Sequence, residues 1–306
     1  MVCIFCLFPK KTENYMEIIS TLINGLSAGS TYACIALGYT MVYGIAKMLN
    51  FAHGDVIMVG GYMIFLSISG NMPVPVAILA ALISCTLLGI TIERVAYRPL
   101  RGASPLAVLI TAIGVSYLLQ SLALIIFGSD SKLVNNLMIH ASITLGSLTI
   151  SWGTIVTLIS ATVIMAALTL FVKFTKTGRA MIAVSEDRDA ARLMGVNVNA
   201  VIMITFAIGS ALAAAAGAFM LMKSPSVSSV MGAMPGIKAF TAAVIGGIGS
   251  IPGAMIGGIL LGVVECVCNQ ISFIAPYTDA VEFSLLIVIL LVKPSGILGK
   301  KRREKV

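Results

Sequence analysis

The chain has 306 residues, of which 58% are hydrophobic and only 10% are charged, and its mean hydropathy is +1.04. A soluble domain carries about 25% charged residues, so this composition excludes an ordinary globular protein. The apolar runs are continuous rather than alternating, which excludes an outer-membrane barrel. We therefore predict an all-α polytopic membrane protein.

Residues 1–15 precede the first clear apolar span. They begin MVCIFCLFPKK, in which the positive charges follow the apolar run, the reverse of the order in a signal peptide. A second methionine, Met16, comes directly before the span. We interpret residues 1–15 as an N-terminal extension that reflects the choice of start site, and residues 16–299 as one transmembrane domain.

Eight apolar segments follow, and most have the roughly 20 residues that one membrane crossing needs. They are Ile18–Ala46, Val56–Gly70, Val74–Ala96, Leu106–Gly128, Trp152–Phe174, Ala200–Met222, Ile237–Asn269 and Tyr277–Leu298. The first and the seventh are too long for one straight crossing. We expect broken or re-entrant helices in those regions.

Residues 48–62, MLNFAHGDVIMVGGY, place polar side chains and glycines beside the first long segment. Polar groups at membrane depth are costly unless they line a path or meet partners. We interpret Asn50, His53 and Gly54 as candidates for a translocation path or its gate. The alternative is a helix–helix turn at the membrane surface, in which Asn50, His53 and Asp55 only cap helix ends.

Basic residues are concentrated in three clusters, which hold 14 of the 20 lysines and arginines: Arg94–Arg101, Lys173–Arg192 and Lys293–Lys305. Apolar spans separate them, the pattern of cytoplasmic loops and not of a nucleic-acid surface. We therefore predict no nucleic-acid partner and a basic cytosolic tail at residues 300–306. An even number of crossings must join the second cluster to this tail, but three apolar segments lie between them. One segment therefore does not cross singly, and we expect it to be Ile237–Asn269, which would enter from outside, turn and return.

The loop 175–200 contains a predicted short helix, Glu186–Met194, with charges and caps at both ends. Its marker residues are Ser185 as the N-cap, Glu186 and Asp187 in the first turn, Ala190 and Leu193 on an apolar stripe, and Gly195 after the C-terminus. A nine-residue helix is marginal alone. It should dock either on its own membrane domain or on a cytosolic partner protein.

The stretch GGIGSIPG interrupts the seventh apolar segment, because glycines and a proline break helices. Irregular backbone at membrane depth is tolerated only inside protein or along a cavity. Glu265, later in the same segment, either faces the passage or marks the outer interface of the membrane. The path or gate candidates in this region are Gly246, Gly247, Gly249, Pro252 and Glu265.

Small residues recur four apart after this break, at Gly253 and Gly257 and again at Gly258 and Gly262. Such spacing lets helix backbones approach closely. We expect packing within the chain rather than a seam between subunits.

Three stretches together resemble the permease subunit of bacterial branched-chain amino acid ABC importers. They are Gly38–Tyr62, Gly178–Asn197 and Ala243–Glu265, and the resemblance covers nearly the whole chain from Met16 onward. It implies a multi-pass protein of the bacterial inner membrane. Urea-uptake permeases are close relatives, so uptake of urea or a short amide is the alternative substrate assignment.

The resemblance also implies partners. These are a second related permease subunit, two cytosolic ATP-binding subunits and an extracytoplasmic substrate-binding protein. In such importers a short helix of the permease docks on each ATPase, and the predicted helix Glu186–Met194 matches that role by its position.

The sequence contains no phosphate-binding loop, because GILGKK near the tail lacks the required spacing and the final hydroxyl residue. It also lacks a nucleophile–base set and a metal-ligand cluster. We therefore predict no enzyme activity, no cofactor and no metal in this chain. A competing class is an ion-coupled secondary transporter, which would use an intramembrane carboxylate such as Glu265 at a broken helix.

Overall fold

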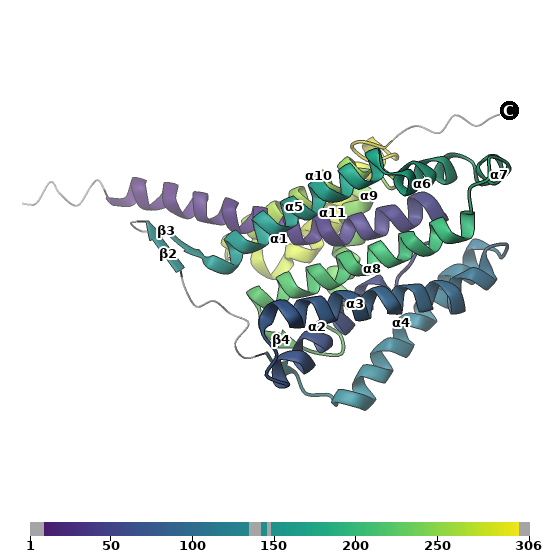
Figure 1. The fold of residues 1–306 in the computed structure, drawn as a ribbon. Helices are drawn as coiled ribbons and strands as arrows, with labels where there is room; N and C mark the ends of the chain where they lie inside the picture. The colour runs from purple at the N-terminus through teal and green to yellow at the C-terminus, as the bar shows by residue number, and fades with distance from the viewer. Residues whose placement is uncertain (1–8, 135–141, 146–147, 300–306) are drawn as a thin grey trace, which may run out of the picture.

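The computed structural model describes residues 9–134, 142–145 and 148–299, and these form a bundle of α-helices. Figure 1 shows the chain from the purple N-terminal helix to the yellow C-terminal helices. The helices are α1 (Pro9–Ala46), α2 (His53–Ser69), α3 (Val74–Ile92), α4 (Pro105–Phe127), α5 (Trp152–Phe174), α6 (Lys176–Glu186), α7 (Arg188–Leu193), α8 (Val198–Lys223), α9 (Ala233–Gly246), α10 (Ile251–Gln270) and α11 (Thr278–Val292). The prediction of an all-α polytopic fold is confirmed.

Short elements complete the described chain. A π-helical turn, Glu93–Tyr97, and 3-10 turns at Arg98–Leu100 and Ala275–Tyr277 extend neighbouring helices. Strand β1 (Lys132–Leu133) pairs antiparallel with β4 (Ser226–Val227), and β2 (Ser142–Leu145) pairs antiparallel with β3 (Leu148–Ser151).

Seven helical segments in the described ranges are long and apolar enough to cross a membrane. They are Ile18–Ala46, Val74–Leu100, Pro105–Phe127, Trp152–Phe174, Val198–Lys223, Ile251–Gln270 and Ala275–Val292. Two shorter apolar helices, α2 and α9, lie among them. Helix α1 begins before its apolar part and so includes residues 9–15 of the predicted extension. The long segment Ile237–Asn269 is divided between α9 and α10, which confirms its predicted break. The other long segment, Ile18–Ala46, lies within the continuous helix α1, and the chain breaks only after Ala46, so the expected break inside that segment is wrong.

The two ends of the bundle differ. One end holds α6, α7 and the end of the described chain, and we call it the α7 end; the opposite end holds the β2–β3 hairpin and the start of α1 (Figure 1). The segment after α11 is bound at the α7 end, where the backbone N–H groups of Ile297 and Leu298 donate to the carbonyls of Ile245 and Gly246. Loop 175–200 and the segment leading to the tail therefore lie together.

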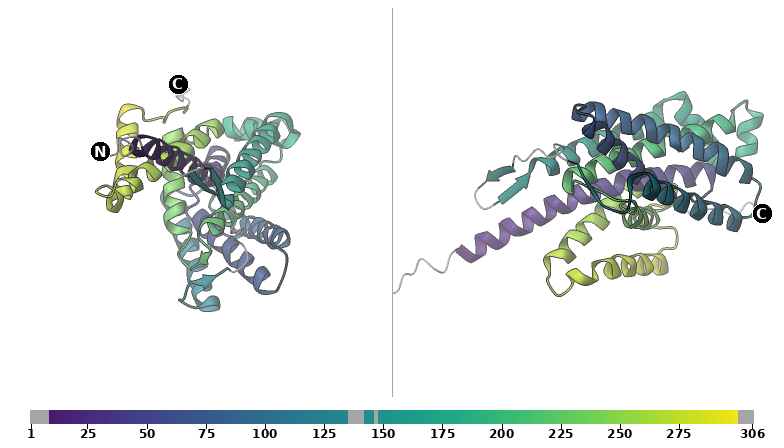
Figure 2. Two further views of the ribbon diagram at one scale, coloured as in Figure 1. Left: turned by 90° about the vertical axis from the view of Figure 1, so that its left-hand side faces the viewer. Right: turned by 90° about the horizontal axis from the view of Figure 1, so that it is seen from below.

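Helix α1 runs through the middle of the bundle, with α3 and the yellow C-terminal helices on opposite sides of it (Figure 2). It packs closely against α10 through glycines. An added Cβ at Gly258 would lie 2.4 Å from the Ala33 backbone, and one at Gly262 would lie 2.1 Å from the Gly29 nitrogen. The expectation that these small residues mediate packing within the chain is confirmed, because two backbones meet there without side chains between them.

Candidate functional site

Helix α7 begins at Arg188 and is capped by the residue before it. The Asp187 side chain accepts hydrogen bonds from the backbone N–H groups of Asp189 and Ala190, each at 3.0 Å. At the other end Gly195 has a φ of +82°, the left-handed conformation that commonly follows a helix C-terminus. The position predicted for Gly195 is therefore confirmed.

The predicted start of this helix is wrong. Ser185 and Glu186 are the last residues of α6, and the Ser185 hydroxyl donates to the Ile182 carbonyl at 2.7 Å instead of capping a helix. The residues before them form a helix because Met181 and Val184 are buried against the bundle. The loop therefore holds two helices, α6 and α7, which meet at the extended residue Asp187.

The apolar stripe of α7 faces away from the bundle. Leu193 is 89% exposed and Met194 is 84% exposed, and Ala190 beside them is exposed as well. Ala191, which sequence reasoning did not select, is the buried residue that packs α7 onto the chain. The membrane domain of this chain therefore does not cover the stripe. This excludes the first of the two alternatives above, in which the helix docks on its own membrane domain.

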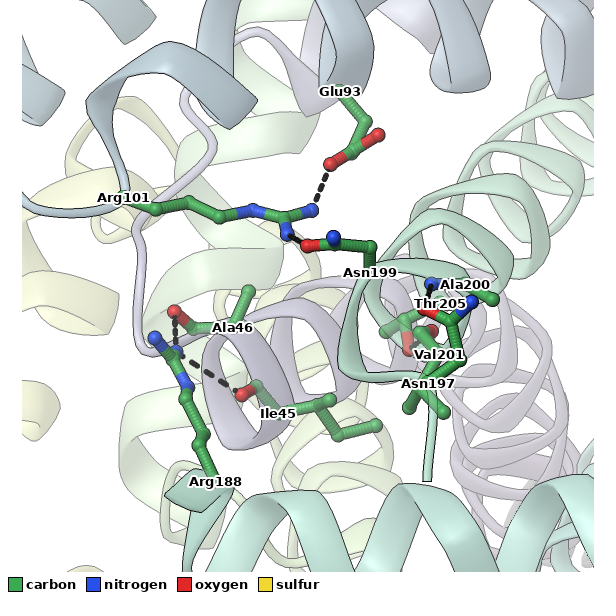
Figure 3. A network of polar contacts seen from close by, with 10 residues as sticks. All are labelled: Ile45, Ala46, Glu93, Arg101, Arg188, Asn197, Asn199, Ala200, Val201 and Thr205. Atoms are coloured by element: carbon green, nitrogen blue, oxygen red, sulfur yellow. Dashed lines mark hydrogen bonds and ion pairs between the residues drawn. The ribbon is translucent and has the colours of Figure 1, made fainter. Parts of the chain in front are cut away.

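Two arginines connect elements at the α7 end, and Figure 3 shows them from close by. Arg188 of α7 donates to the backbone carbonyl of Ile45 at 3.2 Å and also to that of Ala46. Arg101 donates to the carboxylate of Glu93, which is buried, and to the side chain of Asn199 at the start of α8. Sequence reasoning missed both contacts, because it indicated only that these residues belong to basic clusters.

The connection between α1 and α2 is a tight break in the backbone. Lys47 has a φ of +51°, and α2 starts six residues later. Asn50 is buried and its side-chain oxygen accepts a hydrogen bond of 2.9 Å from the Tyr97 hydroxyl, which also donates to the Leu49 carbonyl. Asn50 therefore does not cap a helix end, and the structure holds this segment against the π-helical turn.

His53 and Gly54 occupy the first turn of α2, where neighbouring helices come close. The His53 ring is 1% exposed and lies edge-on to Tyr39, with 4.7 Å between ring centroids. Its Nε2 atom points at Gly38, where an added Cβ would lie at 2.4 Å. An added Cβ at Gly54 would lie 2.5 Å from the Gly232 carbonyl, so this glycine permits close packing before α9.

Asp55 is the third polar residue of this region. It is buried in the first turn of α2, and it accepts a hydrogen bond of 2.8 Å from the Gln120 side chain of α4. Asn50, His53 and Asp55 thus meet other parts of the same chain. These contacts pack the α1–α2 break against α1, α4 and the π-helical turn.

The break between α9 and α10 is built from the predicted residues. Gly247 and Gly249 have φ values of +106° and +93°, which side chains other than glycine rarely adopt. Gly246 approaches Gly253 so closely that an added Cβ would lie 2.0 Å from the Gly253 carbonyl oxygen. Pro252 stands in the first turn of α10, where its missing N–H costs nothing.

This break lies at the α7 end of the bundle. An added Cβ at Gly44, near the end of α1, would lie 3.3 Å from the Gly249 Cα. Helix α9 therefore runs to the α7 end of the bundle, where the chain turns and continues as α10. Two breaks, α1–α2 and α9–α10, meet around the last turn of α1.

Glu265 belongs to a group of charged residues that we call the Lys238 cluster, and its members are Lys238 of α9, Glu265 of α10, and Asp279 and Glu282 of α11. Lys238 and Glu282 are buried, Glu265 is half-buried, and Asp279 is exposed. The Lys238 Nζ lies 2.8 Å from Glu265 Oε1, 2.8 Å from Asp279 Oδ1 and 3.3 Å from Glu282 Oε2. Lys238 is 7% exposed, and sequence reasoning did not select it. Glu265 is therefore not an isolated carboxylate, since it pairs with an ammonium group that it shares with Asp279 and Glu282.

The comparisons with known proteins identify the family. Residues 21–290 match the family model described as branched-chain amino acid transport system / permease component. The chain belongs to this family. Permease components carry no catalytic activity of their own, and they are multi-pass proteins of the bacterial inner membrane, as the sequence predicts.

Individual relatives match over nearly their full length. The chain is 45% identical to the high-affinity branched-chain amino acid transport permease BraD of Pseudomonas aeruginosa, over 94% of this chain and 98% of that one. It is 42% identical to the high-affinity branched-chain amino acid transport permease LivH of Escherichia coli K12, over 96% of this chain and 100% of LivH. The chain is 26% identical to the ribose import permease RbsC of Haemophilus influenzae, over 93% of this chain and 87% of RbsC. Permeases for chemically different substrates thus share this sequence pattern.

Proposed function

We propose that this permease forms the membrane passage for leucine, isoleucine and valine in an ABC importer. The observation that supports the assignment most is the 45% identity to BraD, which extends over 94% of this chain. The ribose permease is much more distant, at 26% identity. The overall architecture alone does not select a substrate, so the proposal rests on this difference in identity.

The proposal includes partner subunits. A second related permease completes the passage, two cytosolic ATPases drive it, and an extracytoplasmic binding protein delivers the amino acid. Helix α7 supports the ATPase contact: Leu193 and Met194 are exposed on a capped helix at the end of the bundle. Apolar side chains presented in this way gain stability when a partner covers them.

The proposed orientation places the α7 end in the cytosol. The basic cluster Lys173–Arg192 includes α6 and α7 at this end, and the segment that leads into the basic cluster Lys293–Lys305 binds there through Ile297 and Leu298. Basic residues are expected in cytoplasmic segments. After α7 the chain traverses the bundle four times, as α8, α9, α10 and α11. This number is even, so the chain returns to the α7 end. The segment 129–151 is then extracytoplasmic.

An ion-coupled secondary transporter is less well supported. Such a transporter needs a carboxylate that is free to bind and release an ion. Glu265, the candidate for that role, pairs with Lys238 at 2.8 Å. Its carboxylate is therefore already engaged in an ion pair within the chain.

Uptake of labelled substrates tests the substrate assignment. The complete complex would be reconstituted with the binding protein and supplied with ATP, and labelled leucine, isoleucine, valine, ribose and urea would be compared. We expect uptake of the three branched amino acids. Transport of urea or ribose with no transport of leucine would overturn the proposal.

A further inference from the structure

We infer that Arg188 is a positioning residue that carries movement of α7 to the last turn of α1. The inference deepens the proposed function, because it rests on the proposed contact between α7 and an ATPase. It names the residue through which that contact would reach the membrane-spanning helices.

The contact of Arg188 suits this role. Its guanidinium group donates to the carbonyls of Ile45 and Ala46, the last two residues of α1. The last carbonyls of a helix lack partners within it, and a cation is favourable at this end of the helix dipole. Because both hydrogen bonds come from one planar guanidinium group, they fix the orientation of Arg188 relative to the end of α1 as well as its distance from it.

The environment of Arg188 differs from that of an ordinary surface arginine. Burial, and then the nearby guanidinium group of Arg101, lower the pKa of Arg188. A cation in such a place is costly unless acceptors offset the lost hydration, and the two carbonyls provide them. By contrast, Arg192 on the same helix is exposed and pairs with Asp189 within α7, at 3.9 Å.

The last turn of α1 is next to both breaks in the spanning helices. Lys47, with its positive φ, directly follows Ala46, and Asn50 is held by Tyr97. On the other side Gly44 meets Gly249 of the α9–α10 break. If Arg188 transmits a shift of α7, the last turn of α1 moves with it. The α1–α2 break and the α9–α10 break both contact this turn, so both would be displaced.

Transport stoichiometry tests this inference. In the complete reconstituted complex, leucine imported per ATP hydrolysed would be measured for wild type, Arg188→Ala and Arg188→Lys, with Arg179→Ala as the matched control. We expect Arg188→Ala to retain the ATPase subunits and ATP hydrolysis while the ratio falls at least tenfold. Arg188→Lys should restore part of the ratio, because a lysine can still donate to one carbonyl. Arg179→Ala should leave the ratio unchanged, because Arg179 is an exposed arginine of α6, outside the proposed contact of α7 with an ATPase.

A second measurement keeps Arg188 in place, so that loss of folding in the variants cannot obscure the result. Spin labels at Lys47→Cys and Arg192→Cys report the distance between α1 and α7, and a label at Asp130→Cys serves as a reference at the far end. On ATP binding we expect the Arg192–Asp130 distance to change while the Arg192–Lys47 distance stays constant. Independent movement of α7 and α1 would overturn the inference.

The outcomes separate the two proposals. If wild type imports leucine with ATP but Arg188→Ala has the wild-type ratio, the inference about Arg188 fails and the proposed function stands. If the wild-type complex does not import branched amino acids with ATP, the proposed function fails and the inference fails with it.

Discussion

At the scale of single residues, the Lys238 cluster shows how charge is accommodated inside the bundle. One ammonium group meets carboxylates from α10 and α11, and Glu282 is fully buried. Charged groups inside a membrane protein are tolerated when they pair with each other. Removing Lys238 leaves the buried Glu282 without its cation, and an unpaired buried charge costs more than the pair contributes.

The substitution Lys238→Met is expected to lower the free energy of unfolding by about 3–5 kcal/mol, because it leaves Glu265 and Glu282 without a cation. Unfolding in mixed micelles with increasing SDS measures this change. Lys223→Met is the control, since Lys223 is an exposed lysine at the end of α8. Equal stability of the two variants would show that the cluster does not contribute.

The substitution Gly258→Ala tests the contact between α1 and α10. Its Cβ would lie 2.4 Å from the Ala33 backbone, so the helices must separate, at a cost of about 1–3 kcal/mol. Gly114→Ala is the matched control, because a Cβ there meets nothing within 4 Å. SDS unfolding should distinguish the two, and an unchanged Gly258→Ala protein would contradict the close packing.

At the scale of elements, the sequence predicts breaks better than it predicts which residue caps a helix. The Gly-Pro stretch identifies the α9–α10 break because glycine and proline act locally, through their own backbone preferences. Ser185 and Asp187 are both suitable N-caps, and burial of Met181 and Val184 decides between them by extending α6. That burial depends on the rest of the bundle, so the local pattern could not predict it.

Long-range polar contacts were the other part that the sequence could not predict. Lys238 lies 27 residues from Glu265 and 44 residues from Glu282 along the chain. Arg188 is 142 residues from Ala46. No periodicity links residues so far apart, and only the arrangement of the helices brings them together.

The exposed stripe of α7 leads to a prediction about assembly. We expect Leu193→Asp to abolish co-purification of the ATPase subunits, because a carboxylate would be buried without a partner in the contact. Leu193→Met is the matched control, since it keeps an apolar side chain of similar volume. Normal co-purification of Leu193→Asp would mean that α7 is an ordinary loop helix.

At the scale of the whole molecule, the distribution of basic residues predicts the orientation, and the helix order agrees with it. The number of crossings depends on whether Ile237–Asn269 passes once or twice, and the structure has two helices there. The crossing count and the charge bias therefore lead to the same orientation.

Single-cysteine labelling in a cysteine-free background tests this orientation. With an impermeant reagent and intact cells, we expect Asp130→Cys to react and Arg192→Cys to react only after the membrane is opened. Both residues are exposed, so access to the reagent depends on the side of the membrane. The reverse pattern of labelling would contradict the proposed orientation.

The central claim is that this chain passes branched-chain amino acids through the membrane at the expense of ATP hydrolysed by partner subunits. Leucine uptake into proteoliposomes that contain the complete complex tests it most directly. We predict uptake that requires ATP and the binding protein and that continues when ionophores dissipate proton and sodium gradients. Leucine uptake that proceeds without the ATPases and follows an imposed ion gradient would contradict the account.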